Sequence, residues 1–250
     1  MKKKRKLKNW VVITFIIIFL ISTMFFSIRV ILWRIGNNQN KKIERKVNKK
    51  INIKINKKNK DYKYKIDFKA LKKQNSDTIA YIKVNNTKID YVVVKTNDND
   101  YYLKHNFDKK YNVSGWIFGD YKNKFDGTDK NLVIYGHNTS NGSMFGTLKK
   151  TLNNDWFENK DNHIILLITE KNTYYYEVFS TYTIIPEDYY INTNFKDSDE
   201  FNKFVKKIKS RSVNNYKTEV NDTEKILTLS SCINNGNKRV VLHAKLIKTE

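Results

Sequence analysis

The sequence contains very little cysteine, proline or glycine. Its 250 residues include one cysteine, one proline and eight glycines. A single cysteine excludes a disulfide framework and any metal site built from several thiolates. The shortage of proline and glycine excludes collagen-like, proline-rich and glycine-rich low-complexity chains. Hydrophobic residues make up 40% of the chain, which suffices for one folded core with appendages or for two small domains.

Acidic residues are also scarce, above all at the N-terminus. The chain has 48 lysines and arginines against 25 aspartates and glutamates, a formal net charge of +23. Residues 1–60 contain 18 of the basic residues and a single acidic one, so they contribute +17 and leave +6 for residues 61–250. A nucleic-acid-binding protein needs its basic surface on the folded domain. The distribution therefore argues against nucleic acid as a partner.

The N-terminus has the pattern of a membrane anchor. Residues 2–8 carry six positive charges and precede an uncharged, mostly apolar run from Asn9 to Ile28. As a helix this run is long enough to cross about 30 Å of hydrocarbon. No small-residue cleavage site stands out, which favours an uncleaved signal anchor over a removed signal peptide. We expect a cytoplasmic basic tail over 1–8 and a single-pass transmembrane signal anchor over 9–33, with Trp33 at the interface.

Residues 34–60 are polar, strongly cationic and poor in aromatic residues. This composition predicts a lysine-rich stalk, partly helical at most, that holds the domain away from the membrane. Two interpretations stay open: the stalk lies against anionic lipid or an anionic wall polymer, or it is a solvated linker. The remaining residues, 61–250, are predicted to form the functional domain outside the membrane.

That domain is predicted to be mainly β. Short runs rich in Val, Ile, Tyr and Thr alternate with Asn/Asp/Gly clusters, as strands and turns require. Seven or eight strands in this arrangement indicate a barrel or sandwich rather than a βαβ protein. The predicted strands are 78–84, 88–94, 115–118, 131–136, 163–169, 173–185, 225–231 and 239–247.

Helices are predicted at four places in the domain, over 66–73, 98–104, 144–158 and 198–211. The last is the clearest, because Phe201, Phe204, Val205 and Ile208 recur at the spacing of one helix face. Asp197 is a reasonable N-cap, with Glu200 three residues further on. The apolar face of this helix is expected to pack on the core.

The lone cysteine, Cys232, ends a predicted strand, and the next strand begins at Arg239. If the two strands pair as a hairpin, about 4.8 Å apart, the guanidinium reaches a group bound at the sulfur. An arginine in that position binds the oxyanion formed when a thiolate attacks a carbonyl. A buried, inert cysteine is the commoner case. An unpaired thiol outside the cytoplasm is an oxidation liability, however, which favours a nucleophile.

A nucleophilic cysteine needs a nearby histidine to manage protons. Of the four histidines, His137 ranks first, because it follows the strand 131–136 and Gly136 allows a sharp exit from that strand. His105 lies in a Tyr/Asn-rich loop, His163 begins a strand, and His243 lies too deep in its strand. The sequence lacks the common nucleotide-binding, zinc-protease, serine-hydrolase and C-x-x-C motifs.

The segment NLVIYGHNTSNGSMFGTL (131–148), followed by TLSSC (228–232) and Arg239, strongly resembles the sortases, the membrane-anchored cysteine transpeptidases of Gram-positive surfaces. The resemblance covers residues 66–247 and is greatest to class B, through residues 101–120, the pair Met144-Phe145 and the helix before the cysteine strand. It implies a closed eight-stranded sortase-type β barrel with short helices. It also implies a catalytic set of His137, Cys232 and Arg239.

The resemblance further implies the reaction. Cys232 would cleave a C-terminal sorting motif of the LPxTG/NPxTN type after threonine, and the thioacyl enzyme would pass the surface protein to an amine of the cell-wall precursor. Ser230 is a candidate for a substrate hydrogen bond. No metal or organic cofactor is required. The partners are then surface proteins with a sorting signal, the acceptor amine, and the membrane through the N-terminal helix.

Two features depart from the family pattern. Asn85-Asn86 replaces the usual Pro-Gly in a turn, and the gap between Cys232 and Arg239 is short for class B. Two other functions stay open on the residues alone. One is a different extracytoplasmic Cys/His peptidase, although papain-like enzymes place the cysteine before the histidine. The other is a non-enzymatic anchored binder of anionic wall polymer.

Overall fold

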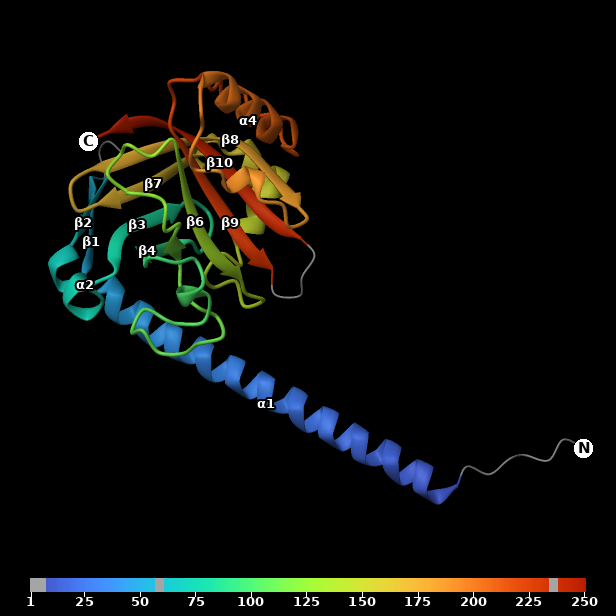
Figure 1. Cartoon of the computed structure of the whole chain (residues 1–250). Coiled ribbons are helices and arrows are strands. Elements are labelled where there is room, and N and C mark those ends of the chain that lie inside the picture. Colours follow the sequence, from blue (N-terminus) through green and yellow to red (C-terminus); the bar gives the residue numbers. More distant parts are fainter. Residues whose placement is uncertain (1–7, 57–60, 234–237) are drawn as a thin grey trace, which may run out of the picture.

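The structure is a computed structural model that describes residues 8–56, 61–233 and 238–250; of residues 52–56, 61–63, 232 and 233 it describes the backbone. A closed barrel of eight strands forms the body of the molecule, and one long helix extends from it towards the N-terminus (Figure 1). This confirms the predicted fold class.

The strands of the barrel follow the order β10-β8-β7-β3-β4-β5-β6-β9, which closes on itself because β9 also pairs with β10. Most pairs are antiparallel, but β4–β5 and β6–β9 are parallel. The strands are β3 (Thr78–Val84), β4 (Asp90–Val94), β5 (Phe118–Gly119), β6 (Asn131–Asn138), β7 (Ile164–Thr169), β8 (Thr173–Ile184), β9 (Ile226–Ile233) and β10 (Arg239–Thr249).

All eight predicted strands are present, with differences at their ends. The run 115–118 contributes only Phe118 to β5, because the chain turns at Gly115, whose φ is +54°. The strand over 131–136 does not end at Gly136 but continues through His137 to Asn138. Gly136 has a packing role instead: a Cβ there would lie 2.4 Å from Ile117 Cδ1 and 2.8 Å from Phe145 Cγ. The expected sharp exit was therefore wrong.

The two faces of β9 and β10 pack against different clusters. Leu227, Leu229 and Leu242 belong to the cluster that fills the barrel. Ile226 and Val241, which alternate with them, belong to a second cluster on the outside of the barrel. Since side chains alternate along a strand, every second residue of β9 and β10 faces outwards.

Helix α4 (Ser198–Ser210) covers that outer face (Figure 1). Its buried residues are the four expected from the spacing, Phe201, Phe204, Val205 and Ile208. The Asp197 side chain accepts a hydrogen bond from the backbone N–H of Glu200 at 2.8 Å, as expected of an N-cap.

Apart from α4, the helices that follow residue 66 are short. Helix α2 (Phe68–Gln74) starts two residues later than expected, because Asp67 caps it and Ile66 belongs to a strand. Single turns of 3-10 helix occur between the strands. The remaining elements are η1 (Tyr101–Leu103), η2 (Leu148–Leu152), α3 (Asn154–Glu158), η3 (Lys160–His163) and η4 (Tyr189–Ile191).

The N-terminal helix α1 (Asn9–Asn48) is much longer than the predicted membrane span and enters the segment predicted as a stalk. It has the length and apolar composition to cross a membrane. Residues 34–48 are helical, in keeping with a stalk that is helical in part. The hairpin that follows, of β1 (Ile51–Asn56) and β2 (Asp61–Ile66), was not expected. Residues 57–60 of the predicted stalk lie outside the described residues.

The end of α1 packs on the barrel through both polar groups and the apolar residues Ile43 and Val47. Gly36, Asn37, Asn40, Ile43 and Val47 are buried. Asn40 Nδ2 donates to the carbonyl of Gly115 at 3.2 Å. Asn112 Nδ2 donates to the carbonyl of Gly36 at 2.9 Å, and Ser114 Oγ donates to Asn37 Oδ1 at the same distance. Buried hydrogen bonds are directional, so this junction fixes the angle between α1 and the barrel.

The packing of α4 gives a stability prediction. Ile208→Ala should lower the free energy of unfolding by about 2–5 kcal/mol, because Ile208 is fully buried beneath the helix. Urea denaturation of the full chain in detergent measures the change. Lys206→Ala, on the exposed face, should stay within about 0.5 kcal/mol of the parent. Equal effects of the two variants would contradict the packing.

Candidate active site

The backbone register brings His137 and Cys232 side by side. Strands β6 and β9 run parallel, and His137 pairs with Cys232 in their register. Paired residues on neighbouring strands point to the same face, and the strands lie about 4.8 Å apart. The odd-numbered residues of β6 and the even-numbered residues of β9 share the outer face, so His137 and Cys232 share it too.

Arg239 lies on the same row. In the antiparallel pair β9–β10, Val241 is opposite Ser230, and continuing the register by two residues sets Arg239 opposite Cys232. The backbone N–H of Val240 donates to Ser231 Oγ at 3.0 Å, which supports this continuation. The three predicted residues therefore form one row across β6, β9 and β10. The Cys232 side chain itself lies outside the described part of the structure.

His137 is held by a backbone group from a distant loop. Its side chain is 8% exposed, and Nε2 lies 2.7 Å from the carbonyl oxygen of Leu103 in η1. A carbonyl only accepts, so Nε2 carries the proton. Nδ1 is buried and has no hydrogen-bond partner among the side chains that the structure describes. The imidazole is thus fixed with its second nitrogen open for proton transfer.

Burial also sets the charge of this histidine. The pKa of His137 is lowered from its usual 6.5, chiefly because burial disfavours the imidazolium, while the hydrogen bond to Leu103 acts in the opposite direction. The imidazole is therefore neutral at pH 7 in the protein without bound substrate. Such a group can accept a proton and return it, as a general acid–base catalyst requires.

Tyr190 connects Arg239 with Ser230. The Tyr190 hydroxyl accepts a hydrogen bond from Arg239 Nη1 at 3.0 Å and lies 3.0 Å from Ser230 Oγ. Ser230 and Tyr190 are both fully buried. Ser230 is two residues before Cys232 and faces the same side. The hydroxyl pair therefore orients the guanidinium on the same face as Cys232.

A cavity of about 640 Å³ is lined by residues that are chain neighbours of Tyr190 and not by the row itself. Its walls include Ile191 and Asn192, residues of α4, and Asp120. Asp120 Oδ2 accepts a hydrogen bond from the Tyr135 hydroxyl at 2.7 Å, and Tyr135 is two residues before His137 on the same face of β6. Tyr190 and Tyr135 therefore link the cavity walls to the row.

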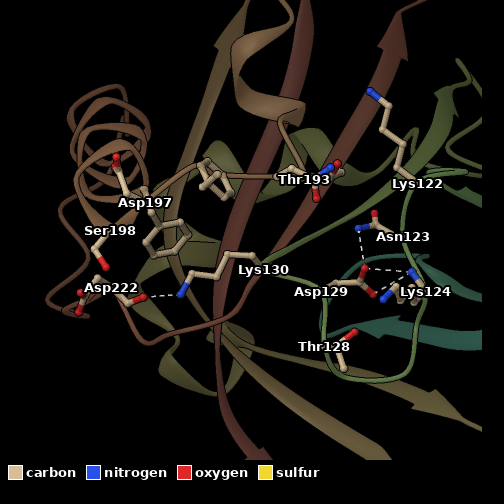
Figure 2. Close-up of a pocket in the computed structure, with 13 residues that line it drawn as sticks. Lys122, Asn123, Lys124, Thr128, Asp129, Lys130, Thr193, Asp197, Ser198 and Asp222 are labelled. Carbon is tan, nitrogen blue, oxygen red and sulfur yellow. Dashed lines mark hydrogen bonds between the residues drawn. The ribbon is translucent and has the colours of Figure 1, made fainter.

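A second cavity, of about 390 Å³, lies at the other end of β6 (Figure 2). Its polar groups bind one another. Lys130 donates to the carbonyl of Asp222, and its Nζ lies 4.2 Å from the centre of the Phe201 ring. Asp129 accepts hydrogen bonds from Asn123 and from the backbone of Lys124. Lys130 and Asp129 are thus occupied with structural contacts inside this cavity.

The other three histidines are outside the row or have both nitrogens bonded. His105 Nδ1 lies 2.7 Å from the Tyr101 carbonyl, and His163 Nε2 lies 2.8 Å from the Phe157 carbonyl. His243 lies on the outer face beneath α4, fully buried, with Tyr182 and Thr228 hydroxyls at its two nitrogens. Among the residues that the structure describes, no group of three or more His, Cys, Asp or Glu side chains could hold a metal ion.

The family follows from these observations and from the comparison with known proteins. A closed barrel with histidine, cysteine and arginine on neighbouring strand ends is the arrangement that the sequence motifs led us to expect. Residues 82–247 match the family model of the sortase domain. The chain therefore belongs to the sortase family, and it is a sortase enzyme, a cell-wall transpeptidase.

The relatives are sortases of class B, which confirms the predicted class. The chain is 30% identical over 184 residues to sortase B of Listeria monocytogenes, covering 72% of this chain and 74% of that protein. A crystal structure of sortase B from B. anthracis superposes with a TM-score of 0.73 at 33% identity, covering 86% of this chain and 99% of that one. A Staphylococcus aureus sortase B–substrate complex gives 0.68 at 32% identity, covering 72% and 84%.

His243 gives a pH prediction for stability. Burial lowers the pKa of His243 to about 3, against 6.5 in the unfolded chain. Between these values the unfolded state binds a proton that the folded state does not. Stability should therefore fall as the pH falls through this window, by about 1.4 kcal/mol per pH unit for this group.

Urea denaturation of the full chain in detergent between pH 5 and pH 6.5 measures this slope. His243→Gln should flatten it by about one proton, because glutamine keeps a polar group at the site without titrating. His163→Gln is the matched control. An unchanged slope in His243→Gln would show that another group sets the acid sensitivity.

Proposed function

We propose that the protein cleaves a C-terminal sorting motif of the LPxTG/NPxTN type after its threonine and transfers the surface protein to an amine of the cell-wall precursor. The observation that supports this most directly is the pairing of His137 with Cys232, with Arg239 next in the register. Three groups with these chemistries on adjacent strands suit acyl transfer through a thioester.

The first half-reaction forms the acyl enzyme. His137 Nδ1 takes the Cys232 proton, and the thiolate attacks the threonine carbonyl to form a C–S bond and an oxyanion. Arg239 binds the oxyanion. When the C–N bond breaks, Nδ1 returns the proton to the departing amine. Because burial lowers the pKa of His137, the ionised pair is the minority form at neutral pH.

The second half-reaction releases the product. The acceptor amine attacks the thioester carbonyl, neutral His137 takes its proton, and the thiolate departs with the C–S bond electrons. Support for an amine acceptor comes from a structure described as sortase B complexed with triglycine. We assign the residues before the threonine to the cavity lined by Ile191 and Asn192, which follow Tyr190, the partner of Arg239. Ser230 is fully buried and its hydroxyl pairs with that of Tyr190, so it acts behind Arg239 and not as a direct substrate contact.

The same proposal includes the topology. Residues 1–8 form a cytoplasmic tail, 9–33 a transmembrane signal anchor, 34–60 the connection and 61–250 the extracytoplasmic catalytic domain. The length and composition of α1 support the anchor, and the charge on residues 2–8 supports a cytoplasmic N-terminus. The protein then resides in the cell membrane, crossing it once.

The central test uses the full chain in detergent with quenched LPxTG and NPxTN peptides, with and without triglycine. Cys232→Ala should abolish cleavage, and the parent should form the triglycine adduct, detected by mass spectrometry. His137→Gln should lose activity to a similar degree, whereas His163→Gln, outside the row, should retain it. Cleavage by Cys232→Ala, or equal loss in both histidine variants, would contradict the assignment.

The proposed role of Arg239 depends on the planar, forked geometry of its guanidinium, and a substitution can test this. Arg239→Lys should be severely impaired, because a point charge does not reproduce the fork of the guanidinium. Tyr190→Phe removes the hydroxyl that holds Arg239, and kcat/KM should fall by about ten- to a hundredfold, the loss of one hydrogen bond to a charged group. In the double variant the two losses should not add. Full additivity would show that Tyr190 acts independently of Arg239.

A further inference from the structure

We propose that the loop 104–112 docks on the phospholipid headgroups of the membrane that α1 crosses. The proposal rests on the membrane topology given above and not on the transpeptidase chemistry. It assigns a lipid-binding surface to a loop whose preceding residue, Leu103, holds the imidazole of His137.

The first argument is height along α1. The predicted span ends at Trp33, and Gly36 is three residues further, about 4.5 Å along the helix axis. The headgroup layer on each side of a bilayer is about 5–7 Å thick. Gly36 therefore lies within that layer when the span occupies the hydrocarbon. Gly36 is also the first buried residue of α1, the point at which the barrel meets the helix.

The second argument is that the part of the barrel in contact with α1 at Gly36 is the loop 104–112. The side chain of Asn112 donates hydrogen bonds to the Gly36 carbonyl and, at 3.1 Å, to Asn40 Oδ1. Asn112 ends the loop 104–112, which lies beside α1 (Figure 1). The loop is therefore fixed at the level of the headgroups by direct contact with the membrane helix.

The third argument is the chemistry that the loop exposes. Lys104, Lys109, Lys110 and Tyr111 are exposed, and the Tyr111 side chain is 64% accessible. Lysine attracts anionic headgroups, and tyrosine is enriched at membrane interfaces, where its ring and hydroxyl face different media. Lys109 is paired with Asp77 at 2.9 Å. The surface offered to lipid is therefore chiefly Lys104, Lys110 and Tyr111.

The loop is also preformed. Asn106 Oδ1 accepts hydrogen bonds from the backbone N–H groups of Asp108 and Lys110, and His105 forms an isolated β-bridge with Tyr111. The His105 ring stacks on Tyr101 with 4.0 Å between the ring centres. A rigid loop loses little conformational entropy on docking, so a few contacts suffice to hold it against the membrane.

Fluorescence quenching in vesicles tests the proposal. The full chain carries Tyr111→Cys in a Cys232→Ala background, is labelled with bimane, and is reconstituted in phosphatidylcholine with phosphatidylglycerol. Nitroxide on the lipid headgroup is the quencher. Val213→Cys, with 59% of its side chain exposed beyond the end of α4, is the matched control. We expect several-fold stronger quenching at position 111 than at 213, and equal quenching would overturn the proposal.

The charge dependence is tested with two double variants. Lys104→Gln with Lys110→Gln should weaken quenching at position 111 in anionic vesicles. Lys171→Gln with Lys206→Gln removes the same charge elsewhere and should leave it unchanged. Equal effects of the two pairs would overturn the role of the loop lysines.

A label at a third position distinguishes failure of the loop contact from failure of the membrane anchor. Ser22→Cys lies within α1, and a nitroxide on the acyl chain should quench it. Quenching at 22 without quenching at 111 refutes the loop contact and leaves the anchor standing. Absence of both refutes the anchor and the loop contact together. None of these measurements uses a substrate, so their outcome is independent of the transpeptidase assignment.

Discussion

The parallel pairing of β6 with β9 is the interaction on which the site depends. These strands are far apart in the sequence, and only closure of the barrel brings them together. Apolar residues such as Leu227 and Leu229 must face the interior. A shift of one residue would turn them outwards and turn Cys232 inwards. Burial of the core therefore specifies the register that aligns His137 with Cys232.

Two buried histidines on this barrel differ in their hydrogen-bond partners, and this difference separates a structural histidine from a candidate catalytic one. Burial lowers the pKa of both His137 and His243. His243 has a hydroxyl at each nitrogen, so it is a neutral, satisfied part of the packing beneath α4. His137 has one nitrogen bound to a carbonyl and the other open. Among the side chains that the structure describes, His243 thus has a partner at both nitrogens and His137 at only one.

Local patterns predicted most of the fold and the residues of the row. The spacing of Phe201, Phe204 and Ile208 predicted α4, and the expected hairpin between the strand of Cys232 and the next strand placed Arg239 near the cysteine. The contacts made by single groups from distant elements were not predictable. Tyr190 lies 40 residues before Ser230, and no spacing rule connects them. The contact of His137 with the Leu103 carbonyl was not predictable either, because every residue has a backbone carbonyl and the sequence does not single this one out.

The polar junction was missed for a related reason. Composition alone suggested a linker in residues 36–60, because asparagine and lysine are abundant there. The burial of Asn37 and Asn40 depends on Asn112 and Ser114, which are more than 70 residues away. A polar segment is predicted to be solvated unless its distant partners are known.

The continuity of α1 from the apolar segment into the barrel has a mechanical consequence. In the proposed topology, a helix with no hinge at its junction sets both the height and the orientation of the active site relative to the cell surface. Each residue inserted between Trp33 and Gly36 would raise the barrel by about 1.5 Å and turn it by about 100°. In the proposed topology, incoming polypeptides must therefore approach the active site at a fixed height above the membrane and from a fixed direction.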